Sequence, residues 1–308
     1  MNHSSHRPRI AVLATGGTIA CTADANGALV PTVDCAGLLD AVASALKGID
    51  TVAVDLVQLD SSSITLADLD LIVSAVHEQL RNDSIDGVVL THGTDSMEET
   101  AMALDLFHDR SKPVVMTGAQ RAFDHPQSDG LTNLVDALRL AARGNVSDVV
   151  IQFGSQTIPA RGAYKKHTTE LRAFSSIAVN RPSALPLPVT PLAGNKVATI
   201  AAYPGGARLL IDAAVSAGYQ GLVVSAMGSG NMGPDMGAAV ADALREGVKV
   251  VISSRVAEGD IKLSYGGAGG GATLADLGAV GSGRLRAGQA RIALAAALAT
   301  GTDVAELV

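Results

Sequence analysis

The chain has few aromatic residues and few cysteines, and both shortages restrict what it can be. Aromatic residues make up 3% of its 308 residues, and none is tryptophan. This composition argues against a protein that stacks nucleic-acid bases on aromatic rings. The two cysteines, Cys21 and Cys35, are too few for a disulfide framework and lack zinc-site spacing. We therefore interpret them as small buried apolar residues and expect no bound metal.

Positive charge and long apolar runs are also scarce. The net charge of −7 opposes binding to a phosphate backbone, so a small-molecule substrate is expected and nucleic acid is not. No apolar run reaches the length of about 18 residues that a membrane span needs. Basic Met1–Arg9 followed by apolar Ile10–Leu13 faintly resembles a secretion signal, but the run stops at Thr15. We expect a cytoplasmic protein without membrane contact.

Strand-like runs alternate with helical patterns along the first half of the chain. Helices are expected at Leu66–Leu80, with Thr65 and Asp68 as a starting cap, and at Leu131–Ala142. The short runs rich in Val and Ile predict buried parallel strands at Ile10–Ala14, Val52–Leu59, Val88–Leu90, Pro113–Met116 and Val149–Phe153.

A proline-rich stretch without periodicity separates a second, smaller α/β unit from the first. The prediction is an α/β fold with a larger N-terminal domain over residues 1–182, built on a doubly wound, mostly parallel sheet. A linker follows at 183–195 and a C-terminal α/β domain at 196–308. Its expected strands and helices are Val197–Ala202, Leu222–Ala226, Val248–Ser253, Ala207–Ala217, Gly237–Glu246 and Ala287–Ala299, with a glycine-rich loop at Gly259–Gly271.

Two threonine-glycine turns carry the most specific chemical signal. Ala14–Ala20 ends the first predicted strand, and Thr91–Thr100 ends the third. Open α/β sheets form ligand crevices at the carboxyl ends of their strands, so both turns are expected at one crevice. Within the second turn, Ser96–Glu99 has capping-box spacing and predicts a helix whose amino terminus favours an anionic group.

Threonine can act as a nucleophile if a base removes its proton and donors stabilise the oxyanion. The chain lacks Gly-x-Ser-x-Gly, and no Ser-His-Asp arrangement is evident. Lys165 is a candidate base, although a Lys/Arg run is more often a solvated surface. His92 is interpreted as a packed, hydrogen-bonded residue beside the site.

Four segments together closely resemble the bacterial L-asparaginase and glutaminase-asparaginase family. They are Ala14–Ala20, Thr91–Thr100, Pro113–Arg121 and Ser128–Gly130, and the resemblance runs from about Arg9 to the carboxyl terminus. It implies hydrolysis of L-asparagine to L-aspartate and ammonia through an acyl-enzyme on threonine, without a cofactor. L-Glutamine is a possible second substrate.

The resemblance also implies roles for individual residues. Thr18 matches the nucleophile, while Thr94, Asp95 and Lys165 match a second catalytic group in which Asp95 also holds the substrate ammonium. The remaining matches concern substrate binding. Ser61 and its neighbour Ser62 take the α-carboxylate, Gly17 and Gly93 flank the two threonines, the backbone of Ala119 lines the amide pocket, and Asn231 reaches the active site of a neighbouring subunit in a dimer-of-dimers tetramer.

The chain departs from the family pattern in three places. Cys21–Val33 contains no tyrosine, Ser62 stands where glutamine is common, and Asp260 is the only acidic residue of the glycine-rich loop. Tyr265 is the candidate replacement for the missing tyrosine. The alternatives are a glutaminase-asparaginase of broader specificity, another amide or lactam hydrolase, and a non-catalytic amino-acid-binding or sensing protein. The family's ammonia-supplying subunit for misacylated tRNA is not expected, because it needs a domain before the first motif.

Overall fold

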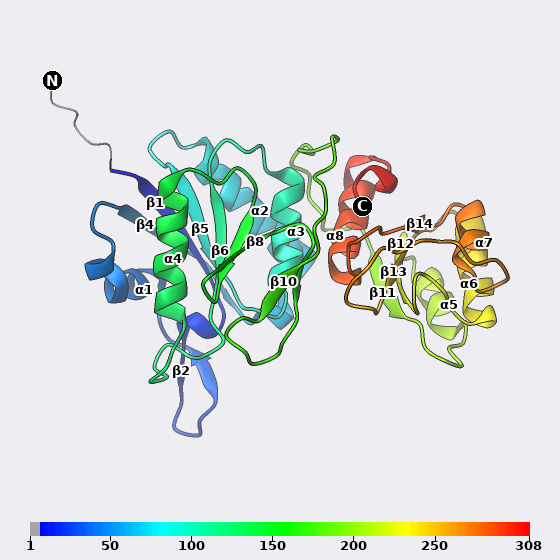
Figure 1. Cartoon of the computed structure of the whole chain (residues 1–308), viewed down its shortest axis with the longest axis horizontal. Coiled ribbons are helices and arrows are strands. Elements are labelled where there is room, and N and C mark those ends of the chain that lie inside the picture. The colour runs from blue at the N-terminus through cyan, green and yellow to red at the C-terminus, as the bar shows by residue number, and fades with distance from the viewer. Residues whose placement is uncertain (1–6) are drawn as a thin grey trace. The chain divides into compact units, whose positions relative to one another are not determined.

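The computed structural model describes residues 7–308 and contains two α/β units. The first ends at Ser176 and the second spans Ile177–Val308 (Figure 1). The predicted pairing of a larger and a smaller α/β domain is confirmed. Our limits at 182 and 196 stay a prediction. Within residues 7–308, no helix combines the length and apolar content that crossing a bilayer requires.

The first unit is built on a six-stranded sheet in the order β4-β1-β5-β6-β7-β8. The first five strands run parallel and β8 is antiparallel to β7. Central strands such as β5 are buried along their whole length, which explains their unbroken apolar sequences. The strands span Arg9–Gly16 (β1), Asp50–Leu59 (β4), Gly87–Thr91 (β5), Val114–Thr117 (β6), Val150–Phe153 (β7) and Gln156–Pro159 (β8).

Helices cover this sheet. One core cluster joins α1 (Cys35–Val42) and α4 (Gly130–Arg143) to strand residues that include Ile10 and Val12. Side chains alternate along a strand, so the intervening strand residues point to the other face. The remaining helices α2 (Leu66–Arg81) and α3 (Met97–Phe107) pack on each other, and α2 also contacts β5.

Several short elements were not predicted, because they are too brief to show a period. An antiparallel hairpin pairs β2 (Cys21–Ala23) with β3 (Leu29–Pro31), and a second pair joins β9 (Ala163–Lys165) to β10 (Phe174–Ser176). Short 3-10 turns occur at η1 (Thr18–Ala20), η2 (Ala43–Ala45) and η3 (Ser61–Ser63).

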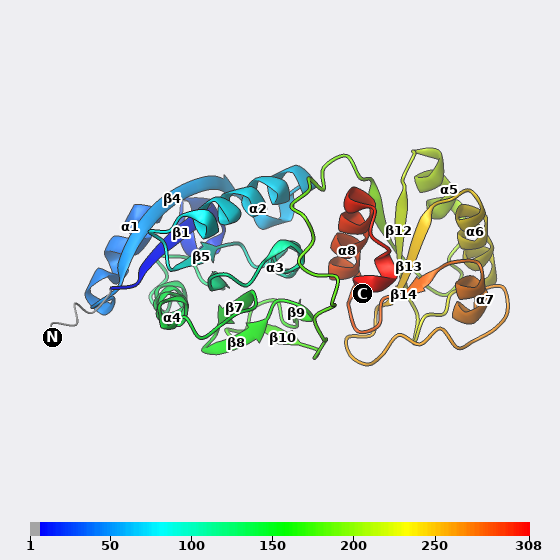
Figure 2. The same cartoon turned by 90° about the horizontal axis from the view of Figure 1, so that it is seen from above.

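The second unit holds a four-stranded parallel sheet in the order β11-β12-β13-β14. Figure 2 shows α8 on one side of this sheet and α5, α6 and α7 on the other. The strands are Val197–Ala201 (β11), Gly221–Ala226 (β12), Lys249–Ser254 (β13) and Val280–Gly281 (β14). The helices are Leu209–Ser216 (α5), Pro234–Arg245 (α6), Gly271–Asp276 (α7), Ala287–Thr300 (α8) and the 3-10 turn Val304–Glu306 (η4).

The two predicted helix caps have different outcomes. At α2, Thr65 and Asp68 form the expected capping box. At α3 the expected capping box is wrong, because Ser96 makes no side-chain capping bond. Its hydroxyl instead donates to the carbonyl oxygen of Ser61 at 2.6 Å. The start of α3 is thereby tied to η3, at the end of a different strand.

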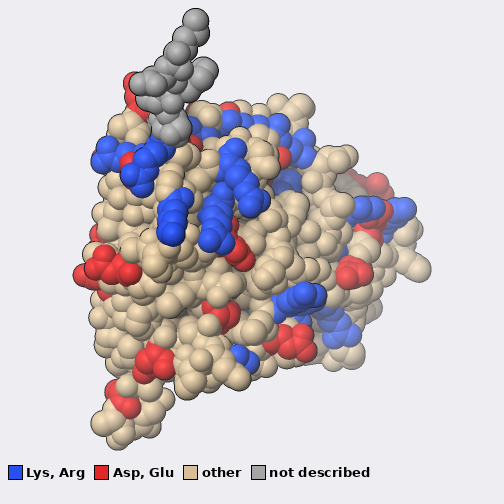
Figure 3. Space-filling view, turned by 60° about the vertical axis from the view of Figure 1, so that its left-hand side comes forward, with Lys and Arg blue, Asp and Glu red and all other residues tan. Residues whose placement is uncertain are grey.

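Charged side chains on the face drawn in Figure 3 are of both signs. Lys and Arg gather toward its upper part, and Asp and Glu are interspersed and continue below, among a larger area of uncharged residues. Such a mixed face differs from the continuous basic surface that binding to a nucleic-acid backbone uses.

Candidate active site

The strand order of the first sheet creates a crevice. From β1 the chain moves to β4 on one side, and it then crosses to β5 on the other side. At such a switch point, the loops that leave the carboxyl ends of the strands diverge and leave room for a ligand. The turns after β1, β4, β5 and β6 all begin at this edge, as the two threonine-glycine turns predicted.

A pocket of about 360 Å³ opens at this edge. All of its lining residues belong to the first unit. They are Gly17, Thr18, Cys21, Leu29, Pro31, Leu59, Asp60, Ser61, Gly93, Thr94, Asp95, Gln120, Lys165 and Thr168.

The two threonine turns contact each other directly. Gly17 has a positive φ of 82°, and a Cβ atom there would lie 2.5 Å from the Cα atom of Gly93. Glycine is therefore required at this position by both conformation and space. A hydrogen bond adds to this contact, because the Thr15 hydroxyl donates to the carbonyl oxygen of Thr91 at 2.9 Å. Thr18 follows at once and opens the turn η1, half-buried at the pocket wall.

Lys165 joins this group from β9. Its Nζ atom donates to Thr94 Oγ1 at 2.8 Å and to Asp95 Oδ1 at 2.6 Å. The Lys165 side chain is 19% exposed, whereas that of Asp95 is 60% exposed at the pocket mouth. Lys165 is therefore not part of a solvated basic surface, which is the commoner location of such a run. A hydroxyl, an ammonium and a carboxylate lie in one chain of hydrogen bonds within the pocket.

Ser61 connects the β4 edge of the pocket to the second threonine turn. Its hydroxyl oxygen accepts the Asp95 backbone N–H at 3.1 Å, which leaves the hydroxyl proton available to a ligand. Ser61 is buried and lines the pocket, while Ser62 is exposed and does not line it. The exposed carboxylate of Asp60 borders the same end.

Glu98 holds the backbone of Lys165. Its Oε2 atom accepts the Lys165 N–H at 2.5 Å, which fixes β9 against the first turn of α3. Burial raises the pKa of Glu98 to about 7, and the charge of Glu99 adds to this effect. The amide and the ammonium of Lys165 act in the opposite direction. A carboxyl that titrates near neutral pH therefore lies directly behind the Lys165 contacts.

His92 contacts the backbone of the second threonine turn. It is fully buried, and its ring contacts the Gly93 carbonyl oxygen through Nδ1 and the Thr100 hydroxyl through Nε2, at 2.7 and 2.9 Å. Burial lowers the pKa of His92 to about 4, so the ring is neutral at physiological pH. The expectation of a packed, hydrogen-bonded histidine is confirmed.

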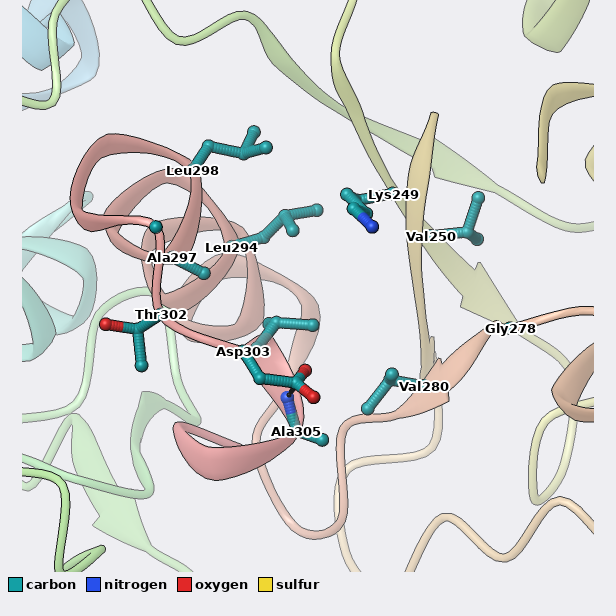
Figure 4. Close-up of a pocket in the computed structure, with 12 residues that line it drawn as sticks. Lys249, Val250, Gly278, Val280, Leu294, Ala297, Leu298, Thr302, Asp303 and Ala305 are labelled. Atoms are coloured by element: carbon teal, nitrogen blue, oxygen red, sulfur yellow. Dashed lines mark hydrogen bonds between the residues drawn. The ribbon is translucent and has the colours of Figure 1, made fainter. Parts of the chain in front are cut away.

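A larger cavity of about 500 Å³ lies in the second unit (Figure 4). It is lined mostly by apolar side chains such as Leu294 and Leu298, with Lys249 and Asp303 as its charged residues. It contains no cluster of hydroxyl, ammonium and carboxylate groups in hydrogen-bond contact. In the described part of the chain, no group of three or more His, Cys, Asp or Glu residues is placed to hold a metal ion. The first-unit pocket is therefore the candidate active site.

Comparison with known proteins agrees with this choice. Residues 9–185 match the model of the asparaginase N-terminal domain, and residues 196–308 match that of the glutaminase/asparaginase C-terminal domain. The chain belongs to the asparaginase family. Its fold matches the crystal structure of a probable cytoplasmic L-asparaginase from Campylobacter jejuni with a TM-score of 0.86 and 30% identity, over 96% of this chain and 97% of that one.

Two relatives show the breadth of the asparaginase family. An L-asparaginase from Bacillus licheniformis is 29% identical over 248 residues, which cover 73% of this chain and 75% of the relative. A component of the glutamyl-tRNA(Gln) amidotransferase of Methanosphaera stadtmanae is 27% identical over 280 residues, 82% of this chain. The match covers only 64% of that relative's length. The chain is thus similar both to L-asparaginases and to a tRNA-amidotransferase component of the same family.

Most of the residues singled out by the asparaginase resemblance come together in the pocket. Ala119 is almost fully buried and does not line it. Asn231 belongs to the second unit, in the segment between β12 and α6. The residues that do line the pocket are Gly17, Thr18, Ser61, Gly93, Thr94, Asp95 and Lys165.

Several pocket residues were missed by sequence reasoning. Gln120 follows β6 at the same sheet edge, so its position beside Ala119 was a usable signal. Leu29 and Pro31 reach the pocket on the hairpin, which has no recognisable period. Cys21 was interpreted as a buried apolar residue, but it is half-buried and lines the pocket. Burial, with a smaller contribution from Asp60, raises the pKa of its thiol, which disfavours a reactive thiolate.

Proposed function

We propose that this protein hydrolyses L-asparagine to L-aspartate and ammonia in the first-unit pocket. The observation that carries the proposal is the position of the Lys165 ammonium, 2.8 Å from Thr94 Oγ1 and 2.6 Å from Asp95 Oδ1, in the pocket that Thr18 lines. Membership of the asparaginase family supports the same reaction.

In the proposed first step, the Thr18 hydroxyl oxygen attacks the carboxamide carbon of the substrate. The C–N bond breaks, the hydroxyl proton passes to the leaving NH2 group and completes ammonia, and an ester to Thr18 remains. Water then attacks the ester, restores the threonine hydroxyl and releases aspartate. Thr94 polarises the water or the substrate carbonyl, and Lys165 moves or stabilises the proton between them. The reaction needs no cofactor.

The charged end of the pocket suits the α-substituents of an amino acid. The Ser61 hydroxyl can donate to the α-carboxylate, because its oxygen already accepts from Asp95 N. The second oxygen of Asp95 is the proposed partner of the α-ammonium, since Oδ1 contacts Lys165. A ligand that carries both charges is thus held at two points, and this orients its side chain toward the threonines.

The same proposal extends to a homotetramer arranged as a dimer of dimers. Asn231 belongs to the second unit, in the segment between β12 and α6. We propose that Asn231 from a second copy completes the pocket, as its match to the family segment implies. L-Glutamine remains a second candidate substrate, because one additional methylene changes binding in a fitted pocket by only about 1–3 kcal/mol.

Ammonia release from L-asparagine, L-glutamine and D-asparagine tests the proposal directly. The purified wild type should release ammonia from L-asparagine, and Thr18→Ala and Thr94→Ala should each reduce the rate by at least about 100-fold, as loss of a nucleophile or a proton-transfer group does. Thr22→Ala is the matched control, because Thr22 lies on the adjacent hairpin but does not line the pocket.

Different results point to the alternatives. Amino-acid binding without turnover of any substrate would reject the hydrolase and favour a sensing protein. Equal turnover of L-asparagine and L-glutamine would indicate a glutaminase-asparaginase. Normal turnover in Thr18→Ala would reject the nucleophile assignment.

A further inference from the structure

The side chain of Gln120 lines the active-site pocket but has no role in the reaction steps above. It directly follows Ala119 after β6, and its Oε1 atom lies 3.5 Å from Thr94 Oγ1. The family resemblance assigns only the backbone of Ala119 to the amide pocket. What the Gln120 side chain contributes depends on which of its two terminal atoms faces a ligand.

Hydrogen bonds determine the orientation of this side chain. Gln120 Nε2 donates to the carbonyl oxygen of Glu170 at 3.1 Å. Because an amide nitrogen only donates and the amide oxygen only accepts, this contact directs Oε1 toward Thr94. The backbone is fixed as well, since Gln120 N lies 3.1 Å from both carboxylate oxygens of buried Asp129. The pocket therefore contains a preorganised neutral acceptor.

Gln120 Oε1 can accept a further hydrogen bond. The Thr94 hydroxyl donates to Gln120 Oε1 at 3.5 Å, the outer limit of a hydrogen bond. A carbonyl oxygen has two lone pairs and accepts two well-formed hydrogen bonds. Gln120 Oε1 can therefore accept an N–H from a ligand without losing its contact with Thr94.

The substrate pose described above brings such a donor near. With the α-substituents at Ser61 and Asp95, the carboxamide of asparagine lies one methylene further in, between Thr18 and Thr94. In that pose its carbonyl would face the nucleophile, and its NH2 group would extend past Thr94 toward Gln120, whose Oε1 atom lies 3.5 Å from Thr94 Oγ1. On the basis of the proposed function, we propose that Gln120 Oε1 accepts an N–H from this carboxamide and selects amide substrate over carboxylate product.

Selection follows from the difference between the side-chain carboxamide of asparagine and the side-chain carboxylate of aspartate. The amide presents an N–H donor to Gln120 Oε1, whereas the aspartate side chain presents an oxygen with lone pairs and negative charge. An acceptor that faces another acceptor is repelled and loses its hydrogen bond to water. Gln120 would therefore strengthen binding of the substrate and weaken retention of the product.

Gln120→Met tests this, because methionine keeps the length of the side chain and removes the acceptor. At pH 8, where the aspartate side chain is ionised, kcat/KM for L-asparagine should fall by about 3- to 10-fold, as expected for loss of one neutral hydrogen bond. Inhibition by L-aspartate should be unchanged or tighter. Gln127→Met is the control, since Gln127 is exposed on the neighbouring segment and does not line the pocket.

If Gln120 had only a structural role, its loss would change the binding of asparagine and of aspartate to the same extent. The ratio of the aspartate inhibition constant to the asparagine KM therefore distinguishes a structural role from selection of the amide. A lower ratio in Gln120→Met supports the proposal, and an unchanged ratio overturns it. Circular dichroism verifies folding, and Gln120→Leu serves as a second variant. If the wild type releases no ammonia from L-asparagine, the proposed function fails. Calorimetry then measures the binding of asparagine and aspartate to wild type and variant. A preferential loss of asparagine binding in the variant supports the proposed selection by Gln120, and any other result overturns it.

Discussion

Replacing Glu98 by glutamine should make the stability of this protein less sensitive to pH. Glu98 lies in the first turn of α3, with Glu99 beside it and Lys165 as its charged partner from β9. Burial raises the pKa of Glu98 from 4.5 to about 7. Glutamine has nearly the same shape and can still accept the Lys165 N–H, but it cannot ionise.

The direction of the effect follows from linkage. A carboxyl whose pKa is higher in the folded state contributes stability below pH 4.5 and loses that contribution as the pH rises through about 7. A change from 4.5 to about 7 corresponds to roughly 3 kcal/mol between the two limits. Glu98→Gln and wild type should therefore be similar at pH 4.5, while at pH 8 the variant should be more stable by about 2–3 kcal/mol.

Urea unfolding followed by circular dichroism at pH 4.5 and pH 8, at one protein concentration, measures this difference. Glu78→Gln on the exposed face of α2 controls for the loss of a surface carboxylate. The reasoning is refuted if the stability difference between Glu98→Gln and wild type is the same at both pH values. It is also refuted if the variant is the less stable protein at pH 8.

Two further predictions concern buried contacts, one a close packing contact and the other an ion pair. Gly93→Ala places a Cβ atom 2.5 Å from Ser61 Oγ, so it should cost about 1–3 kcal/mol of stability and reduce ammonia release at least about 10-fold. Normal turnover would contradict the close approach of Gly93 to Ser61. Asp105→Ala removes the carboxylate that lies 3.0 Å from the buried Arg161 guanidinium, and it should cost about 3–5 kcal/mol in urea unfolding. The double variant Asp105→Leu, Arg161→Met should recover part of that loss, and a single-variant cost under about 1 kcal/mol would reject the role of this ion pair.

The fold and half of the site could be predicted because their signals are local. Buried parallel strands need unbroken apolar runs, and amphipathic helices need apolar residues at helical spacing, so both are visible within short windows of sequence. Thr18 and Thr94 each follow such a run within a few residues. This places both threonines at the carboxyl edge of a sheet, independently of how the rest of the chain folds. The glycines beside them follow from the turn geometry that this position requires.

Only the tertiary structure decided which distant groups meet at that edge. Lys165 is 71 residues from Thr94 in the chain, and its sequence surroundings are typical of a solvated surface. Glu98 and the antiparallel pairing of β9 with β10 bring it into the pocket. Ser96 has the spacing of a helix cap, yet its hydroxyl donates to Ser61 because η3 lies within reach. Periodicity encodes which face of an element is buried, whereas contacts between distant side chains depend on strand order and loop closure, which no local pattern specifies.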